Sequence, residues 1–248
     1  SERYYSEHLL SLPVAQAAIA PSPLADRTRH AELSRADHGL PETGVVFCNF
    51  CPTGHITPDI FDIWMRLLTT TPDSCLWLLQ ANDHATSNLR RAAATRGVDP
   101  DRLVFAPMAD AGTQTNRLAL ADLFLDTFVV NAGAGVRAAL AVGLPVLTLP
   151  GQQYAARTSA SPLQAADLGE LIAADKAEYE TKAALLAADT DARTVLRNKL
   201  LGQHASAPLF APTQHCRQLE AGFDAVFARH LTGQPADHLR IGTTADTA

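Results

Sequence analysis

The sequence of 248 residues lacks several features that would assign a protein to a class at once. It has no apolar run near the roughly 20 residues of a membrane-spanning helix. Its start, SERYYSEH, has neither the basic nor the apolar region of a secretory signal. It also has no basic block, and its formal net charge is -6. These absences argue against membrane and nucleic-acid partners and favour small molecules or proteins. We therefore expect a cytoplasmic protein, or one whose targeting segment lies outside this sequence.

Cysteine is also scarce, with only Cys48, Cys51, Cys75 and Cys216 in the chain. Four dispersed cysteines are too few for a disulfide framework in a chain of this length. Cys48 and Cys51 form a C-x-x-C, which could be a redox pair or half of a zinc site. No second C-x-x-C or close Cys/His pair completes a tetrahedral metal shell, and redox dithiols usually open a helix. We interpret the two as unrelated thiols at the end of a strand, and expect no metal and no cofactor.

Short apolar runs that alternate with amphipathic stretches dominate what the sequence does contain. Such runs are typical of parallel strands buried on both faces, and the alternation predicts helices on both sides of the sheet. The predicted fold class is α/β, a doubly wound parallel sheet with C-terminal helices. The predicted strands are Val45–Phe50, Cys75–Gln80, Leu103–Pro107, Leu120–Thr127 and Pro145–Pro150.

The first predicted helix follows Thr57, which can cap it, and Pro58, which suits its first turn. Further helices are predicted at Ala155–Leu168, Lys176–Ala188, Asp191–Leu201 and Thr213–His230. This pattern divides the chain into an extended arm or inter-lobe connection (1–43), a Rossmann-like core (44–170), helices completing the lobe (171–235) and a polar, frayed tail (236–248).

The loop Phe128–Arg137, after the fourth strand, is the strongest candidate for a ligand site. Asn131, Gly133 and Gly135 interrupt an apolar stretch just before a helix. Small residues at a helix start let a diphosphate approach the backbone amides, whose dipoles favour negative charge. The dinucleotide fingerprint and the Walker loop are both absent. A tight strand-to-helix turn that needs glycine for backbone reasons is the alternative interpretation.

Several segments resemble the C-terminal lobe of protein O-GlcNAc transferases, a two-lobed glycosyltransferase family that includes the SPINDLY-type proteins. The resemblance runs in order from about Ser1 to about Leu231 through YYSEHLLSLP, VVFCNF, ITPDIFDIWMRLL, DSCLWLLQ, RRAAATRGVDPDRLVFAP, LADLFLDT, GLPVLTLPG and APLF. It implies a GT-B lobe whose core binds a nucleotide sugar. It also implies transfer of N-acetylglucosamine from UDP-GlcNAc to serine or threonine of proteins, without an obligatory metal. The implied partner is a protein acceptor together with an N-terminal lobe or a companion chain.

The resemblance also implies a donor-binding set but assigns no catalytic residue in this chain. His55 stands where the family has a lysine near the donor phosphates, Gln114 stands where a histidine holds the uridine, and Arg117 is retained. Gly133 to Gly135 replace a His-Thr-Thr. The implied set is His55, Leu79, Met108, Ala109, Gln114, Arg117, Gly133, Ala134 and Gly135.

The replaced charged residues leave more than one hypothesis for function. One is an active lobe that works with an N-terminal half supplied elsewhere. Another is a catalytically inactive relative that acts as a scaffold or regulatory subunit. A changed donor or a nucleotide-binding regulator is the third. Arg137, which stands where the family has an uncharged residue, either restores positive charge beside the glycine-rich loop or is an exposed helix position.

Overall fold

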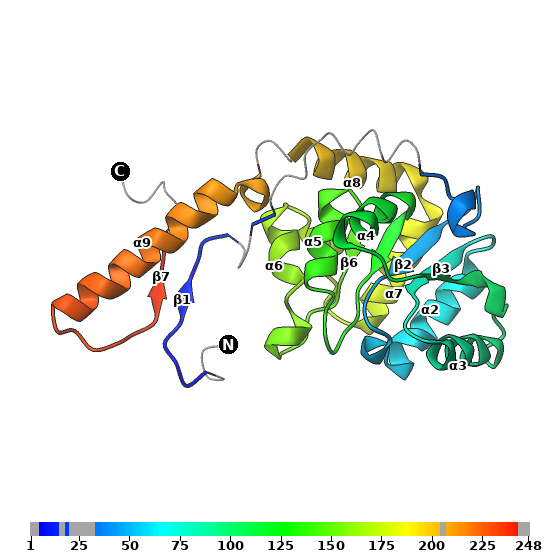
Figure 1. The fold of residues 1–248 in the computed structure, drawn as a ribbon, viewed down its shortest axis with the longest axis horizontal. Helices are drawn as coiled ribbons and strands as arrows, with labels where there is room; N and C mark the ends of the chain where they lie inside the picture. Colours follow the sequence, from blue (N-terminus) through cyan, green and yellow to red (C-terminus); the bar gives the residue numbers. More distant parts are fainter. Residues whose placement is uncertain (1–4, 15–17, 20–32, 204–206, 243–248) are drawn as a thin grey trace.

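The computed structural model describes residues 5–14, 18–19, 33–203 and 207–242. Its centre is a five-stranded sheet in which every pairing is parallel (Figure 1). The strand order is β4-β3-β2-β5-β6. The strands are β2 (Val46–Asn49), β3 (Cys75–Leu79), β4 (Leu103–Ala106), β5 (Leu123–Leu125) and β6 (Val146–Leu147). The predicted doubly wound α/β sheet is therefore confirmed.

Each strand contributes side chains to two separate cores because successive residues point to opposite faces. On β2, Val46 and Cys48 belong to one buried cluster, whereas Phe47 belongs to the other. All three side chains are almost completely buried. Strands covered on both faces in this way read as continuous apolar runs in the sequence.

Helices cover both faces of the sheet. One face packs against α2 (Pro58–Thr70), α3 (Asp83–Ala94) and α7 (Lys176–Ala188), and the other against α5 (Ala134–Ala141), α6 (Ala160–Ala165) and α8 (Thr190–Gln203). The short helix α4 (Ala111–Arg117) follows β4. Every helix within the described ranges is too short or too polar to span a bilayer.

Two details at helix starts differ from the sequence prediction. Thr57 does lie at the N-cap of α2, but its hydroxyl donates to the carboxylate of Asp59 and caps no backbone amide. The helix predicted over Ala155–Leu168 is divided into a 3₁₀ turn, Tyr154–Ala156, and α6. Pro162 lies in the first turn of α6, where its missing N–H and its ring are tolerated, and it prevents a helix from running through from the preceding turn.

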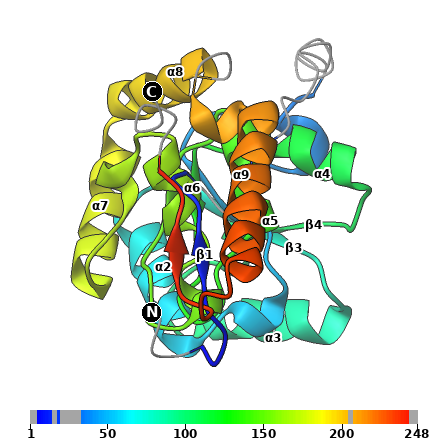
Figure 2. The same cartoon turned by 90° about the vertical axis from the view of Figure 1, so that its left-hand side faces the viewer.

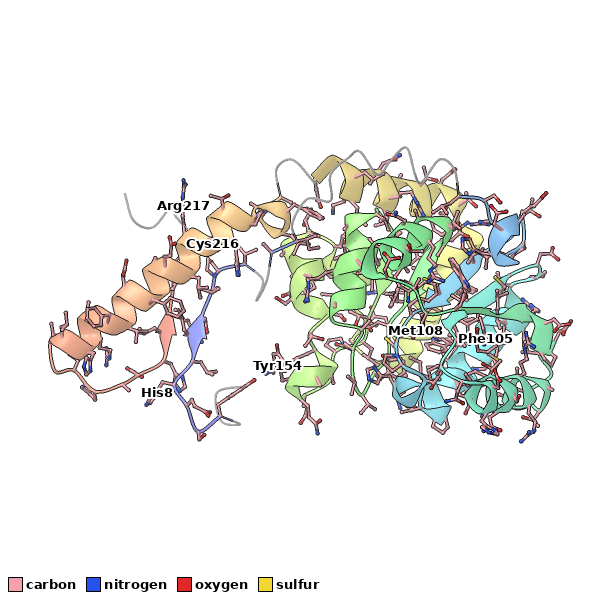
Figure 3. All side chains as sticks on the ribbon, in the orientation of Figure 1. His8, Phe105, Met108, Tyr154, Cys216 and Arg217 are labelled. Atoms are coloured by element: carbon pink, nitrogen blue, oxygen red, sulfur yellow. The ribbon has the colours of Figure 1, made fainter. Side chains whose placement is uncertain are left out.

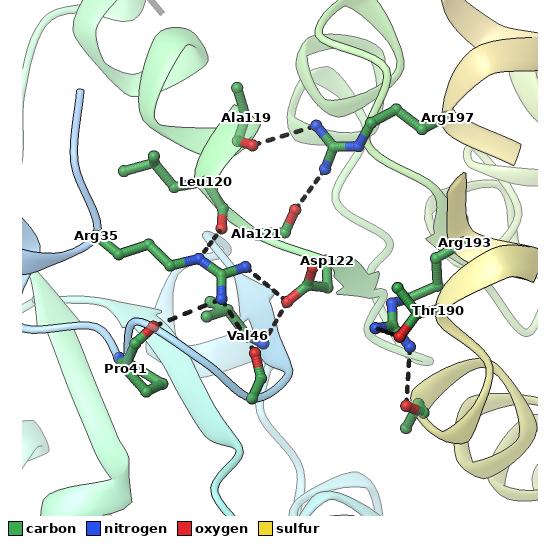
Figure 4. A network of polar contacts seen from close by, with 12 residues as sticks. Arg35, Pro41, Val46, Ala119, Leu120, Ala121, Asp122, Thr190, Arg193 and Arg197 are labelled. Atoms are coloured by element: carbon green, nitrogen blue, oxygen red, sulfur yellow. Dashed lines mark hydrogen bonds and ion pairs between the residues drawn. The ribbon is translucent and has the colours of Figure 1, made fainter. Parts of the chain in front are cut away.

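An ionic network at the amino end of the sheet joins the chain before β2 to the loop before β5 (Figure 4). Arg35 contacts Asp122 at 2.8 Å and also donates to the carbonyl of Leu120. The same Asp122 oxygen accepts the amide of Val46 at 2.7 Å. From the other side, Arg197 on α8 donates to the carbonyls of Ala119 and Ala121. These contacts fix where β2 and β5 begin.

The C-terminal helix α9 (Pro212–Leu231) projects from this lobe together with a two-stranded parallel ribbon (Figures 1 and 2). The ribbon pairs β1 (Leu10–Ser11) with β7 (Leu239–Arg240). Gly222 of α9 lies against Leu10, so close that an added Cβ would be 2.6 Å from it. The helix is rooted in the lobe by the buried residues Leu209 and Phe210, and the carbonyl of Leu209 accepts the amide of Ile19 at 2.7 Å.

The ribbon adds strands to two segments in which the sequence predicts none. The segment 236–248 was expected to be a frayed tail, yet its described part contains β7, whose pairing partner lies about 230 residues away in the chain. No local pattern could show such a partner. The arm 1–43 contains β1, while residues 1–4, 15–17 and 20–32 of that arm lie outside the described residues. The four-part division of the chain itself stays a prediction.

Glycine at position 44 is required by two independent features of the turn before β2. Its φ is +95°, and a methyl group there would lie 2.2 Å from the carbonyl oxygen of Asp73. Gly39 has a similar φ of +66° but open space around its Cα. We expect Gly39→Ala to lower the free energy of unfolding by about 1–2 kcal/mol, the left-handed penalty alone. Gly44→Ala should lower it by about 3 kcal/mol or more, because the backbone must also move.

Urea unfolding of the two variants measures this difference. Equal losses of stability in the two variants would mean that the backbone at Asp73 moves away from the added methyl group without a cost in free energy.

Candidate functional site

The sheet has its topological switch point between its two central strands. From β2 the chain moves outward to β3 and β4, and it then returns to form β5 on the opposite side of β2. Because all strands are parallel, their carboxyl ends share one edge, and ligands of open α/β sheets bind in the crevice where the winding direction changes. The loops after β2 and β5 therefore frame the candidate site.

Side-chain hydrogen bonds tie these two loops to each other below the crevice. Asn49, fully buried at the end of β2, donates to the carbonyl of Leu125 at 2.7 Å and accepts the amide of Cys51 at 3.0 Å. The hydroxyl of Thr127 donates to the carbonyl of Val130 at 2.6 Å and lies 3.6 Å from the sulfur of Cys51. The chain leaves both central strands along a fixed path.

Asp126, which follows β5, is the centre of a polar cluster. One carboxylate oxygen accepts the amides of Thr127 at 3.0 Å and Ala132 at 2.7 Å. The other accepts the hydroxyl of Thr148, from the end of β6, at 2.6 Å. Its backbone carbonyl accepts the hydroxyl of Tyr179 on α7 at 3.1 Å. One residue thus fastens two strand ends, the glycine-rich loop and a helix.

Complete burial determines the electrostatics of this carboxyl group. Burial raises the pKa of Asp126 to about 6, and hydrogen bonds from Thr148 and from the two backbone amides partly oppose that rise. A buried carboxylate is tolerated when several donors satisfy its oxygens.

The loop that Asp126 holds ends at a glycine corner, Gly133 to Gly135, where α5 begins. Gly133 is the N-cap residue, with φ +50° and ψ −101°. The nearest side-chain atom to an added Cβ there would be the hydroxyl oxygen of Thr158, at 4.0 Å. Asn131 braces the corner by donating to the carbonyl of Thr127 at 2.6 Å. Bare backbone at the start of a helix is suited to an anion.

Of the predicted donor-binding residues, the structure places Gly133, Ala134 and Gly135 at this corner, with Ala134 exposed to solvent. His55 lies in a 3₁₀ turn, Thr53–His55, in the loop after β2. These residues therefore flank the switch point from its two sides.

The remaining predicted residues gather at the ends of β3 and β4. Leu79 pairs in register with Ala106, and Met108 and Ala109 come just after β4. Met108 is 69% exposed, and Figure 3 shows it on the surface near Phe105. An exposed apolar side chain next to this crevice can serve as a wall for the flat face of a base.

Three predicted polar residues share one property that points to a missing partner. Nδ1 of His55, Oε1 of Gln114 and Nε of Arg117 are screened from solvent and have no hydrogen-bond partner among the described residues. Buried polar atoms are normally satisfied, so such atoms at one edge of a sheet are candidates for ligand contact.

Arg117 is otherwise occupied by its own fold. Its side chain is almost completely buried, donates to the carbonyl of Pro107 at 2.8 Å and lies 5.7 Å from the ring of Phe50. Burial lowers the pKa of its guanidinium. The residue thus connects the loop after β4 to the end of β2, and its Nε has no partner among the described residues.

Sequence reasoning did not identify Asp126, Thr148 or the bracing role of Asn131. The signal for Asp126 was a single carboxylate at the end of the apolar run LFL, where a charge is expensive unless hydrogen bonds satisfy it. Its partners come from a different strand and from the following loop, so only the fold reveals them.

The C-x-x-C pair does not resemble a redox site. Burial raises the pKa of the Cys51 thiol to about 12 and that of Cys48 well above its usual range. All four cysteines are free, and only Cys216 is exposed. Within the described ranges no group of three or more His, Cys, Asp or Glu residues is arranged to hold a metal ion.

Asp126 makes the stability of the protein depend on pH. An unfolded aspartate titrates near 3.9, whereas Asp126 titrates at about 6, so the native state binds the extra proton between these values. The free energy of unfolding should therefore fall as pH rises through this window, by on the order of 3 kcal/mol. Asp126→Asn keeps an acceptor for both amides and should remove the fall. Urea unfolding at pH 4 to 7 measures it, and the exposed-site variant Asp101→Asn serves as the control. The same slope in all three proteins would contradict the assignment.

The thiols should differ sharply in reactivity. Iodoacetamide at neutral pH is expected to label the native protein at Cys216 alone, because the thiolate is the nucleophile and the other three thiols are buried. Labelling in urea should reach all four. Peptide mass mapping identifies which cysteines are labelled. Rapid labelling of Cys51 in the native protein would contradict its burial below the crevice.

Comparison with known proteins places this geometry in a family. The model of glycosyl transferase family 41 matches residues 24–219. The chain is 34% identical over 210 residues to a Caenorhabditis elegans UDP-N-acetylglucosamine--peptide N-acetylglucosaminyltransferase, covering 85% of this chain and 18% of the relative. It is 32% identical over 208 residues to the Arabidopsis thaliana protein SEC, a probable enzyme of the same name, covering 84% of this chain and 21% of that protein.

Solved structures agree with the sequence matches. The Thermobaculum terrenum O-GlcNAc transferase, as a K341M mutant, superposes with a TM-score of 0.67 at 28% identity, over 75% of this chain and 36% of that one. WaaG, a glycosyltransferase of lipopolysaccharide biosynthesis, superposes with a TM-score of 0.60 at 16% identity, which shows the fold alone. The chain spans about a fifth of the two relatives named above. The predicted resemblance is confirmed, and this chain belongs to glycosyl transferase family 41.

Proposed function

We propose that this chain is the nucleotide-sugar-binding lobe of an enzyme that transfers N-acetylglucosamine from UDP-GlcNAc to serine or threonine hydroxyls of proteins. Two relatives carry the name of that activity. The observation that carries the proposal is the braced glycine corner at the switch point, where Asp126 and Asn131 hold bare backbone at the start of α5. An anion binds there without displacing any side chain.

The other predicted residues receive roles from their positions. Leu79, Met108 and Ala109, at the ends of β3 and β4, form an apolar wall for the uracil ring. The unpartnered atoms of Gln114 and Arg117 lie on the same side and supply polar contacts to the base or ribose. His55, in the loop after β2, faces the phosphates from the side opposite to the corner.

The acceptor site requires a second lobe, which we propose docks on the ribbon and α9. A two-stranded parallel ribbon is too small to bury its own faces. Phe223, Phe227 and Leu231 on the neighbouring helix are each at least 60% exposed. We propose that further strands, from another segment or a companion chain, extend the ribbon and cover this apolar surface. Reduced, mostly buried thiols fit the cytoplasm as the compartment.

A catalytically inactive scaffold is the second candidate. The feature that favours it is the corner itself, where Gly133, Ala134 and Gly135 offer backbone but no side-chain donor. Enzymes of acyl and phosphoryl transfer lose on the order of 100-fold in rate when one preorganised donor is removed. Nucleotide binding without transfer, in the presence of the acceptor lobe, would support this candidate.

Calorimetric titration with UDP and UDP-GlcNAc tests the proposal. We expect binding of both to the parent protein and at least tenfold weaker binding to Gly133→Val, because the added side chain occupies the place of the diphosphate. Gly97→Val is the matched control, since Gly97 also has positive φ with open space around it but lies in the turn after α3. No heat from the parent protein up to millimolar nucleotide would contradict the proposal and leave the scaffold.

A further inference from the structure

A cleft of about 920 Å³ lies between the ribbon and the lobe. Its lining reaches the glycine corner through Thr158, whose hydroxyl would be 4.0 Å from a Cβ added at Gly133. One wall is formed by Tyr5 and by Leu9 to Ser11 of the β1 segment. The opposite wall is formed by the start of α6, by the segment after β6 and by Arg137 of α5. Tyr154, from that segment, projects toward the β1 arm (Figure 3).

The lining of this cleft is positively charged. It contains Arg137 and Arg157 and no carboxylate. Neither guanidinium has a hydrogen bond or ion pair to any part of the chain that the structure describes, whereas Arg35, Arg66 and Arg96 are each paired with an acid. Two unpaired cations that line one cleft repel each other, and an anionic ligand bound between them would relieve this repulsion.

The lysines of the chain are engaged elsewhere. The chain has only three lysines, and each forms an ion pair with an acidic residue. The pairs are Lys176 with Asp59, Lys182 with Glu178 and Lys199 with Asp167. Arg117 is not part of the cleft lining and contacts Pro107 and Phe50 instead. A dianionic ligand bound at the corner would therefore find in Arg137 and Arg157 the two unpaired guanidinium groups that line the adjacent cleft.

Backbone contacts hold both arginines beside the corner. Asn131 pins the segment that carries Arg157 at two points, since its amide donates to the carbonyl of Ala155 at 2.8 Å and its side-chain oxygen accepts the amide of Ser159 at 3.4 Å. Arg137 lies one turn into α5, with its amide 3.3 Å from the carbonyl oxygen of Gly133. Helical side chains lean toward the helix N-terminus, which is the direction of the corner, and Arg137 lines the cleft.

We propose that Arg137 and Arg157 form the cationic clamp for the diphosphate of a nucleotide sugar. This inference rests on the proposed function and assigns its charge-bearing residues. Each guanidinium presents a planar fork of donors that matches two phosphate oxygens, and the amides at the start of α5 bind from the third side. Thr158, whose hydroxyl is the nearest side-chain group to Gly133, completes the rim.

Isothermal titration of the full chain with UDP and with uridine tests the clamp. We expect Arg137→Met and Arg157→Met each to weaken UDP binding by about tenfold, and the double variant by about 100-fold. Uridine, which has no phosphate, should bind all variants equally. Arg137→Lys should retain part of the affinity. Arg217→Met is the control, since Arg217 is exposed on α9 far from the cleft (Figure 3).

Thermal unfolding of each variant confirms that it is folded. A double variant that binds UDP within twofold of the parent would overturn the clamp and leave the proposed function standing. A parent protein that binds neither UDP nor uridine would overturn the proposed function, and the clamp with it.

Discussion

The buried carboxylate of Asp126 is the interaction on which the candidate site depends. Without its acceptors, the amides of Thr127 and Ala132 and the hydroxyl of Thr148 would lose their partners in a region closed to water. An unsatisfied buried group destabilises a fold by about 1–3 kcal/mol. The conformation of the loop after β5 would then no longer be fixed, and the glycine corner depends on that conformation.

The strand β5 is flanked by two carboxylates with opposite environments. Asp122, before the strand, is paired with Arg35 and partly exposed. Asp126, after it, is fully buried and relies on neutral donors alone. Asp126 therefore has no counterion among its contacts with the described residues, because amides and a hydroxyl satisfy both of its oxygens. The amino end of the sheet therefore serves stability, and the carboxyl end keeps room for a charged ligand.

The sheet and its helices could be predicted from the sequence because they follow from local apolar periodicity. VVFCNF and CLWLLQ each contain a strand that is buried on both faces, as β2 and β3 are. The resemblance to the family correctly indicated the fold. The ribbon and the Asp126 cluster could not be found this way, because Leu10 pairs with Leu239 and Asp126 with Thr148 across the fold. Such contacts depend on topology, which periodicity does not encode.

The C-terminal helix α9 is anchored to the lobe at its N-terminal end. The chain passes from the lobe to the helix at Leu209, and the amide of Ile19 donates to the carbonyl of the same residue. The N-terminal and C-terminal segments therefore leave the lobe at one point. A helix of 20 residues is about 30 Å long, so a rotation of about 10° at that point displaces its far end by about 5 Å. The ribbon, carried along by the contact between Gly222 and Leu10, would swing with it and widen or narrow the gap that faces Arg137 and Tyr154.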